Sequence, residues 1–143
     1  MDVTQKALTA VDLARDAPIP GLADRVRGWG YESGVQRVFT GNTPQFSNVI
    51  SRALRFGSAA GARAYVTLLD TRVADYYGTG SKVAPLRSRG RAGYLIDAAS
   101  CGCHRETPIY IAAVSHGPVV TWLYATGRGS TPQALRALLA HAP

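Results

Sequence analysis

The sequence is poor in several residue types, and each shortage excludes a class of protein. Only 17% of the 143 residues are charged while 46% are hydrophobic, which excludes a disordered chain or a coiled coil. Fifteen glycines and eight prolines are spread along the chain, which excludes a collagen-like or low-complexity sequence. The longest apolar run, residues 109–114, is far below the roughly 20 residues of a membrane-spanning helix. The composition predicts one globular domain over residues 1–143, with no membrane span in this segment.

Lysine is also scarce, so the positive charge rests almost entirely on arginine. Lys6 and Lys82 are the only lysines among 16 basic residues, which outnumber 9 acidic residues and give a net charge of +7. A guanidinium stays ionised and can hold a carboxylate or phosphate with two hydrogen bonds, which favours anionic partners. A GC-rich coding bias would account for the arginine excess without any ligand.

Cysteine occurs only in one short cluster. Cys101 and Cys103 are separated by one glycine and are followed directly by His104. A disulfide across one residue is tight because bridged Cα atoms usually lie about 5.5 Å apart, although an intervening glycine relaxes the backbone. Two states are therefore open for this pair: a local disulfide in an exported protein, or two reduced thiols that only pack.

The same cluster is the candidate for metal or thiol chemistry. Two thiolates and the imidazole of His104 are soft ligands for zinc or copper, and His116 or His141 would have to complete a four-ligand shell. Nucleophilic catalysis is not expected, because on a strand His104 would point to the face opposite its neighbouring cysteine.

Groups for other kinds of catalysis do not converge. Asp70 and Asp75 fall on different faces of an expected helix, and no Gly-x-Ser-x-Gly motif occurs. The glycine pairs at residues 28–30 and 78–80 lack the lysine pattern of a phosphate-binding loop. The sequence therefore predicts no enzymatic activity and no cofactor.

Hydrophobic periodicity and turn residues divide the chain into helices and strands. Thr4, Ser58 and Thr131 are candidate N-caps, and Pro132 suits a first helical position. We expect helices over residues 4–15, 58–77 and 131–141; strands over residues 25–31, 35–40, 46–56, 93–99, 108–115 and 119–126; and a basic loop over residues 82–93. This order predicts an α+β fold: a single, mostly antiparallel sheet of about five to six strands, with a long helix packed on one face and short terminal helices.

The basic segment is the strongest binding candidate. Arg87, Arg89 and Arg91 lie close together in the sequence, and Tyr94 and Tyr76 flank them. Four cations including Lys82 beside tyrosines could contact an anionic small molecule, a lipid head group or a glycan. The alternative is a solvated basic loop. Nucleic acid is not expected, because no helix-turn-helix, zinc-finger or aromatic RNA-binding signature accompanies the charge.

Two stretches carry a family resemblance that spans residues 22–141. Gly-Trp-Gly-Tyr at residues 28–31 enters a strand pair, and Phe-Gly-Ser-Ala-Ala-Gly-Ala-Arg-Ala-Tyr at residues 56–65 forms a strand-to-helix step. The chain resembles small exported actinobacterial domains of lipoproteins and membrane-protein sensors. The resemblance implies an α+β sheet of PsbP-like or cystatin-like type, held outside the membrane, that binds a ligand or partner. No lipobox cysteine lies near Met1, so an anchor would belong to a missing segment.

These observations lead to one main functional hypothesis and two alternatives. We expect a non-enzymatic extracytoplasmic binding or sensor module for an anionic or amphipathic ligand or a protein partner, in which sheet and helix enclose an apolar groove with basic edges at Arg87, Arg89 and Arg91. One alternative is a metal-binding or thiol-redox protein that uses Cys101, Cys103 and His104. The other is a structural subunit of an envelope or phage-like assembly. A cytoplasmic location is the alternative to an exported one, because residues 1–5 contain no signal peptide.

Overall fold

The computed structural model describes residues 2–41, 43–98 and 107–142. Within these ranges, seven strands and five helices follow one another. In order they are β1 (Asp2–Ala7), α1 (Ala10–Ala14), α2 (Leu22–Gly28), β2 (Tyr31–Thr40), β3 (Asn48–Phe56), α3 (Ala59–Thr71), α4 (Val73–Tyr77), β4 (Lys82–Ser88), β5 (Arg91–Asp97), β6 (Ile109–His116), β7 (Val119–Thr126) and α5 (Pro132–His141).

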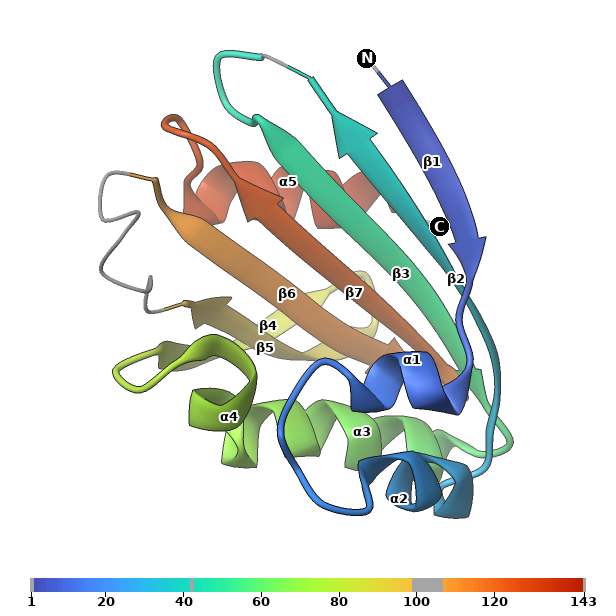
Figure 1. The fold of residues 1–143 in the computed structure, drawn as a ribbon. Coiled ribbons are helices and arrows are strands. Elements are labelled where there is room, and N and C mark those ends of the chain that lie inside the picture. Colours follow the sequence, from blue (N-terminus) through green and yellow to red (C-terminus); the bar gives the residue numbers. More distant parts are fainter. Residues whose placement is uncertain (1, 42, 99–106, 143) are drawn as a thin grey trace.

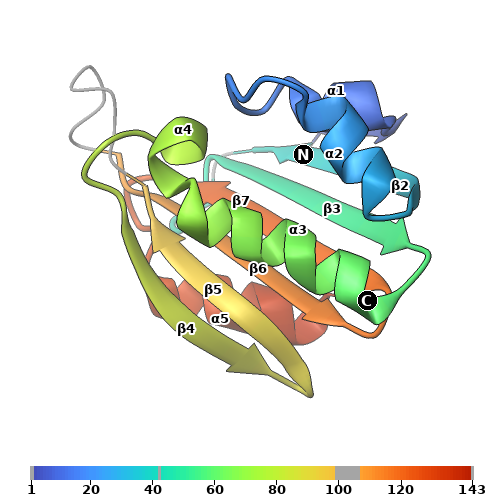
Figure 2. The same ribbon diagram turned by 90° about the horizontal axis from the view of Figure 1, so that it is seen from below.

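All the strands form one antiparallel sheet in the order β1-β2-β3-β7-β6-β5-β4. Helices α1 to α4 lie on one face of this sheet, and α5 lies alone on the other (Figures 1 and 2). We call these the helix-rich face and the α5 face. α3 packs across β5, β6 and β7, whereas α5 packs on β4, β6 and β7. The fold therefore has three layers, and the α5 face is the less completely covered.

The α+β class and the antiparallel sheet are confirmed, but the expected strand number and the long helix are wrong. The sheet has seven strands instead of five to six. The helix expected over residues 58–77 is divided at Arg72, which has φ −117° and ψ 33°, into α3 and the short α4. Ser58 does cap α3 by accepting a hydrogen bond from the backbone N–H of Gly61 at 3.0 Å. Val73 and Tyr76 pack on the same core as α3, so the apolar stripe continues through the break and conceals it.

The N-terminal segment contains the first additional strand. Residues 4–15 were expected to be helical, yet β1 pairs with β2 through six residue pairs, and only the short α1 follows. Thr9, not Thr4, is the N-cap, and it forms a capping box with Asp12. The described side chains of β1 are exposed, so no alternation of apolar and polar residues indicated a strand.

Two further segments differ from the expectation. Residues 25–31 were expected to form a strand, but residues 25–28 belong to α2, which buries Leu22 and Val26, and Tyr31 begins β2. The basic loop expected over residues 82–93 is instead the hairpin of β4 and β5. Arg89 and Gly90 form its turn, with φ of +50° and +79°, as a tight two-residue turn requires. The register of β3 with β7 runs from Asn48 opposite Thr126 to Arg55 opposite Val119 without a bulge.

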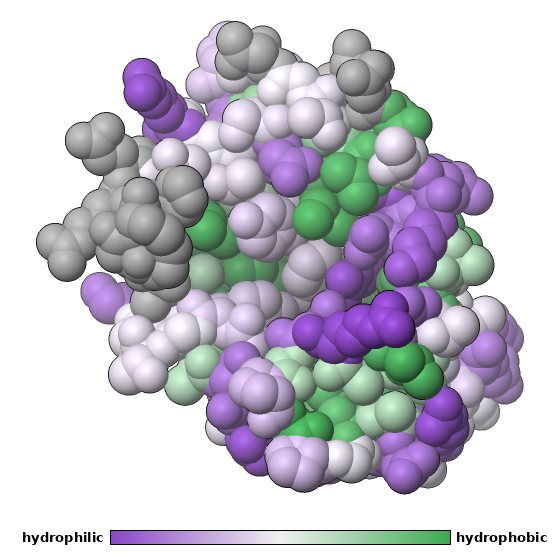
Figure 3. All heavy atoms as spheres, viewed as in Figure 1, coloured by the Kyte–Doolittle hydropathy of each residue, from purple (hydrophilic) through white to green (hydrophobic). Residues whose placement is uncertain are grey.

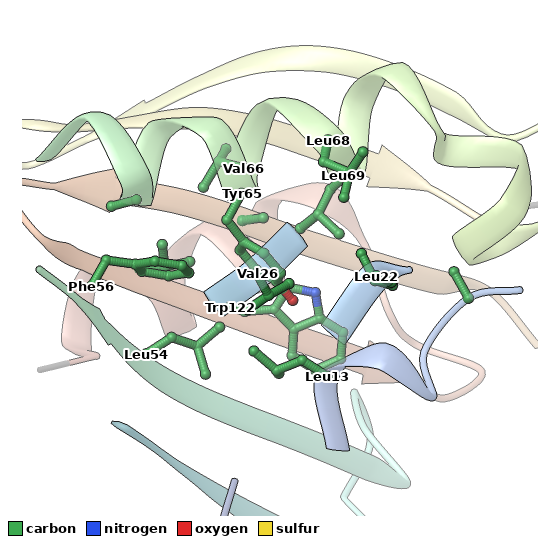
Figure 4. Close-up of a cluster of buried hydrophobic side chains, with 14 of the residues drawn as sticks. Leu13, Leu22, Val26, Leu54, Phe56, Tyr65, Val66, Leu68, Leu69 and Trp122 are labelled. Atoms are coloured by element: carbon green, nitrogen blue, oxygen red, sulfur yellow. The ribbon is translucent and has the colours of Figure 1, made fainter. Parts of the chain in front are cut away.

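Each face of the sheet carries its own hydrophobic core. On the helix-rich face, Leu13, Leu22, Val26 and Tyr65 are buried beside the Trp122 ring (Figure 4). On the α5 face, Leu135 and Leu139 are fully buried against a smaller cluster, made of Leu86, Leu95, Ala112, Val114, Leu123 and Ala125. Burial of the two apolar sides fixes the strand register, because a one-residue shift would exchange the two faces.

The C-terminal end of α5 is attached to the sheet by Arg91. Its guanidinium Nη2 donates to the carbonyl of Leu139 at 2.8 Å, and Nη1 contacts the carbonyl of Ala142 at 3.5 Å and Oγ1 of Thr121 at 3.4 Å. The last carbonyls of a helix have no partner within the helix, and a cation there also interacts favourably with the helix dipole. Arg91 thus stabilises the position of α5 on the sheet.

The backbone of β5 approaches β6 closely at Gly93. A Cβ atom at this position would collide with the carbonyl oxygen of Ala113 and would lie 2.8 Å from Cα of Val114. We expect Gly93→Ala to lower the free energy of unfolding in urea by about 1–3 kcal/mol through this overpacking. Gly28→Ala is the matched control because a Cβ there has open space, and we expect a gain of about 0.4–1 kcal/mol. Equal effects of the two substitutions would contradict this packing.

The role of Arg91 gives a second prediction. Arg91→Ala removes the hydrogen bonds to Leu139 and Ala142, and we expect urea unfolding to show a loss of about 1–3 kcal/mol. Arg87 is exposed on the neighbouring strand, so Arg87→Ala should change stability by no more than about 0.5 kcal/mol. Indistinguishable stabilities for these two alanine variants would show that Arg91 does not hold α5.

Candidate functional site

The part of the α5 face that α5 leaves uncovered forms a groove of about 730 Å³. Its floor consists of alternate residues on neighbouring strands of the sheet. Val35, Arg37 and Phe39 of β2 lie directly opposite Ala53, Ser51 and Val49 of β3, in that order. Leu123 of β7, opposite Ser51, closes the floor on the side toward α5. Residues at i, i+2 and i+4 share one face of a strand and extend over about 14 Å. Most of the floor residues are apolar, so the floor is mainly apolar.

Two other elements form the walls of the groove. The last turn of α5 contributes Leu138 and His141, and the loop between β2 and β3 contributes Phe46. Phe46 and Leu138 both pack against the buried cluster of the α5 face, so the groove is continuous with that core. The walls therefore extend apolar surface from the core out to solvent.

Close backbone contacts hold the loop between β2 and β3 in place. The N–H of Ser47 donates to the carbonyl of Thr126 at 2.9 Å, and Thr43 Oγ1 accepts from the N–H of Phe46 at 2.9 Å. Gly127 has φ +154°, and a Cβ there would lie 2.9 Å from Cα of Phe46. This packing leaves no space for a side chain at residue 127 and keeps Phe46 at the end of the groove.

Polar groups lie at the open side of the groove. Arg37 is exposed, and its Nε donates to Oε1 of Gln5 on β1 at 3.2 Å. His141 is exposed on the last turn of α5. Within the described ranges, Arg37 takes part in no ion pair. The groove therefore combines an apolar floor with a cation that can receive an anionic group.

A second polar cluster lies on the helix-rich face, but its contacts are internal. The Arg52 guanidinium binds both carboxylate oxygens of Asp16 and lies 4.5 Å from the centroid of the Trp122 ring. Trp122 Nε1 in turn donates to the hydroxyl of Tyr77 at 2.8 Å, and burial raises the pKa of that hydroxyl. Figure 3 shows this face, where hydrophilic side chains lie between apolar areas. Because these partners satisfy one another, the cluster joins β3, β7 and α4 structurally.

The structure divides the five residues predicted to bind a ligand between the two faces of the sheet and a turn. Leu86 and Leu95 belong to the core of the α5 face, so by alternation Arg91 lies on that face and Arg87 on the helix-rich face. Arg89 lies in the exposed turn between them. Tyr94 and Tyr76 pack against the core of the helix-rich face. Ligand binding by Arg87, Arg89, Arg91, Tyr94 and Tyr76 stays a prediction, and the groove lies elsewhere.

The cysteine cluster falls outside the described residues. Cys101, Cys103 and His104 lie within residues 99–106, so the disulfide and the metal or thiol hypothesis stay predictions. Of the other proposed ligands, His116 Nδ1 lies 3.2 Å from the carbonyl of Gly90, and His141 lies beside the groove. In the part of the chain that the structure describes, no three His, Cys, Asp or Glu side chains are grouped in a way that could hold a metal ion.

Sequence reasoning did not identify the groove residues. Val35, Arg37 and Phe39 were assigned to a short strand over residues 35–40, whose expected hairpin partner was residues 25–31. Residues 25–28 belong to α2 instead. A strand with apolar residues on both alternating positions, such as Val38 and Phe39, was the available signal, because it indicates a sheet with apolar contacts on both faces. Only the pairing of β2 with β1 and β3 reveals that one of these faces is left open.

Comparison with known proteins supports the fold and gives no family. No family model matches the sequence, and a search of curated proteins finds no significant match. Among solved structures, the chain is similar to the crystal structure of the extracellular domain of PknH from Mycobacterium tuberculosis, with a TM-score of 0.54. The match covers 98% of this chain and 79% of the other at 14% sequence identity.

This likeness agrees with the expected resemblance only at a coarse level. At 14% identity it shows a shared fold with an extracellular domain of a mycobacterial protein, and it assigns no ligand. The PsbP-like, cystatin-like and lipoprotein assignments receive no support from a family model. The comparison therefore shows a similar fold, which in this chain is a seven-stranded antiparallel sheet between two layers of helices.

Proposed function

We propose that this domain is a non-enzymatic extracytoplasmic binding or sensor module whose ligand is amphipathic, with its apolar part in the groove and its anionic end beside Arg37. The open groove between α5 and the floor of β2 and β3 carries this proposal. Its volume of about 730 Å³ lies within the range of about 300–1,000 Å³ that is usual for small-molecule sites. The ligand displaces water from the floor of the groove. In this proposal the groove binds the ligand and does not convert it chemically.

The chemistry of the groove selects an amphipathic ligand over a polar one. Val35, at the centre of its strand, is 38% exposed. Phe39 and Val49 lie beside it on the same face. An apolar chain laid along this floor would remove these side chains from water, while Arg37 would hold a carboxylate or phosphate. The net charge of +7 would also attract an anionic ligand at long range.

The extracytoplasmic location rests on the fold. The solved structure that this chain resembles is itself an extracellular domain, and the match extends over 98% of this chain. Within the described ranges, none of the helices is both long and apolar enough to cross a membrane. The groove would then sample ligands outside the cytoplasm.

Filling the groove tests the proposal. Ala53 is an exposed, small residue of the floor, so Ala53→Trp should occupy the groove without disturbing a buried core. We expect this variant to bind a fluorescent long-chain carboxylic acid about tenfold more weakly than the wild type in a fluorescence titration. Ala60→Trp places the same side chain at an exposed position on α3, on the opposite side of the sheet, and should bind normally.

A charge reversal separates the two ends of the ligand. Arg37→Glu should weaken binding of the fluorescent acid about tenfold and leave binding of its uncharged methyl ester unchanged. Arg63→Glu, at an exposed position on α3, makes the same change in net charge away from the groove and serves as the control. Wild-type affinity for the acid in both Ala53→Trp and Arg37→Glu would refute binding in the groove.

A further inference from the structure

The two edges of the sheet differ in how they are protected. At one edge, β4 contains Pro85, which lacks an N–H, together with the exposed charges of Lys82 and Arg87. Proline and charged side chains are the features that prevent an edge strand from pairing with another chain. At the other edge, β1 contains no proline and pairs with β2 without a bulge. Among the strands that the structure describes, the sheet is therefore blocked at β4 and open at β1.

The hydrogen-bond pattern shows which groups β1 leaves open. The N–H of Leu8 donates to the carbonyl of Gly34 on the β2 side at 2.9 Å. In an antiparallel ladder these bonds alternate from residue to residue, so the even-numbered residues of β1 bond to β2. The N–H and C=O groups of Val3, Gln5 and Ala7 consequently point away from the sheet. They form a row of three donors and three acceptors along its free edge.

The side chains of β1 do not shield this edge. Lys6 is the charged residue of β1 whose side chain is described, and its ammonium is bound to Asp12 of α1 at 3.1 Å, on the helix-rich side. Val3 is 55% exposed and is a neighbour of Phe39 across the β1–β2 pair. The edge thus offers unpaired backbone groups next to an exposed apolar side chain, with no lysine turned outward.

From this edge we propose that β1 pairs with β1 of a second copy of the chain, antiparallel and about a two-fold axis at Gln5. In this register Gln5 lies opposite Gln5 of the second copy, and Val3 lies opposite its Ala7. All three outward-facing residues of each chain then hydrogen-bond to the other, and no two like charges among the described side chains lie opposite each other. A neighbouring register would leave at least one of these residues unpaired.

Apolar complementarity favours a second copy over an unrelated strand. β1 pairs Val3 with Phe39 and Ala7 with Val35 within each chain. The two-fold pairing therefore forms one continuous row on the α5 face. Phe39 and Val3 of one copy lie in this row beside Ala7 and Val35 of the second copy. Val3 and Val35 are among the exposed large apolar residues of the described chain, at 55% and 38%, and both join this row. The chain thus supplies the apolar partner that its own edge requires.

The pairing would join the two sheets and the two grooves. Gln5 and Val35 line the groove, and β1 forms its outer border. In the dimer the two β1 strands would lie at the centre of the joined sheet. The floors of the two grooves would then form one continuous open surface. A single strand pair belongs to the small, weak interfaces that bury less than about 1,200 Å², so the pairing should depend on protein concentration.

Cysteine cross-linking tests the register directly. In a background with Cys101→Ser and Cys103→Ser, which removes both native cysteines, Gln5→Cys should form an intermolecular disulfide under mild oxidation. Directly opposed, hydrogen-bonded residues have Cα atoms about 5.5 Å apart, within the range of a disulfide. Thr4→Cys and Val3→Cys are controls on the same strand, and neither position faces itself in this register. We expect Gln5→Cys to give a disulfide dimer and the controls to give monomer.

Proline at residue 5 tests the pairing without any cross-link. The N–H of Gln5 points away from β2, so Gln5→Pro should leave the melting temperature close to that of the wild type. In sedimentation experiments over a range of concentrations, the wild type should associate into dimers and Gln5→Pro should stay monomeric. A wild type that is monomeric at every concentration, or equal cross-linking of Gln5→Cys and Thr4→Cys, would overturn the proposal. Neither result depends on ligand binding in the groove.

Discussion

A wide sheet with too little helix on one side is the constraint on which this structure depends. Six spacings between seven strands make the sheet about 29 Å wide, whereas α5, with 10 residues, is about 15 Å long and about 10 Å in diameter. On the helix-rich face, α1 to α4 together cover the apolar side chains of the sheet. On the α5 face one short helix covers β4, β6 and β7, and the floor formed by β2 and β3 stays open. The groove is the direct result of this mismatch.

The open floor is compatible with a folded, water-exposed protein because polar side chains interrupt it. Arg37 and Ser51 lie opposite each other between the apolar pairs Val35–Ala53 and Phe39–Val49. Singly placed apolar side chains are normal on a protein surface, whereas a broad continuous patch indicates a binding site. The floor is intermediate, because its apolar residues are several but are interrupted by Arg37 and Ser51. A ligand with an anionic group can cover these apolar residues and also pair with Arg37, so no buried charge is left unpaired. The same interrupted pattern reaches the free edge at β1.

The sequence was informative where local chemistry decides the structure. Ser58 and Thr131 act as N-caps as expected, and β7 has the expected bounds. These signals lie in the side chains themselves: a hydroxyl that accepts a backbone hydrogen bond, and an apolar run between turns. The antiparallel sheet also followed from them, because short connections such as the one at Gly117 favour hairpins.

The sequence was uninformative where long-range pairing decides the structure. β1 is exposed and polar, and β4 is basic and contains Pro85; both are strands because a neighbouring strand pairs with them. The same reason explains the candidate site. Arg87 and Arg91 are near each other in sequence but lie on opposite faces of one hairpin, whereas Arg37 and His141 are far apart in sequence and border one groove. Charge clustering along a chain does not show convergence in space.

The central claim is that a ligand binds on the open floor of the α5 face. The most direct test is to locate the backbone amides whose chemical shifts change when a ligand is added. Two-dimensional ¹H–¹⁵N NMR spectra recorded during a titration with a long-chain carboxylic acid report each amide separately. If the open floor is the binding site, the shifts will concentrate at residues 35–39, 49–53 and 138–142. Shifts confined to the β4–β5 hairpin or to the helix-rich face would contradict the account.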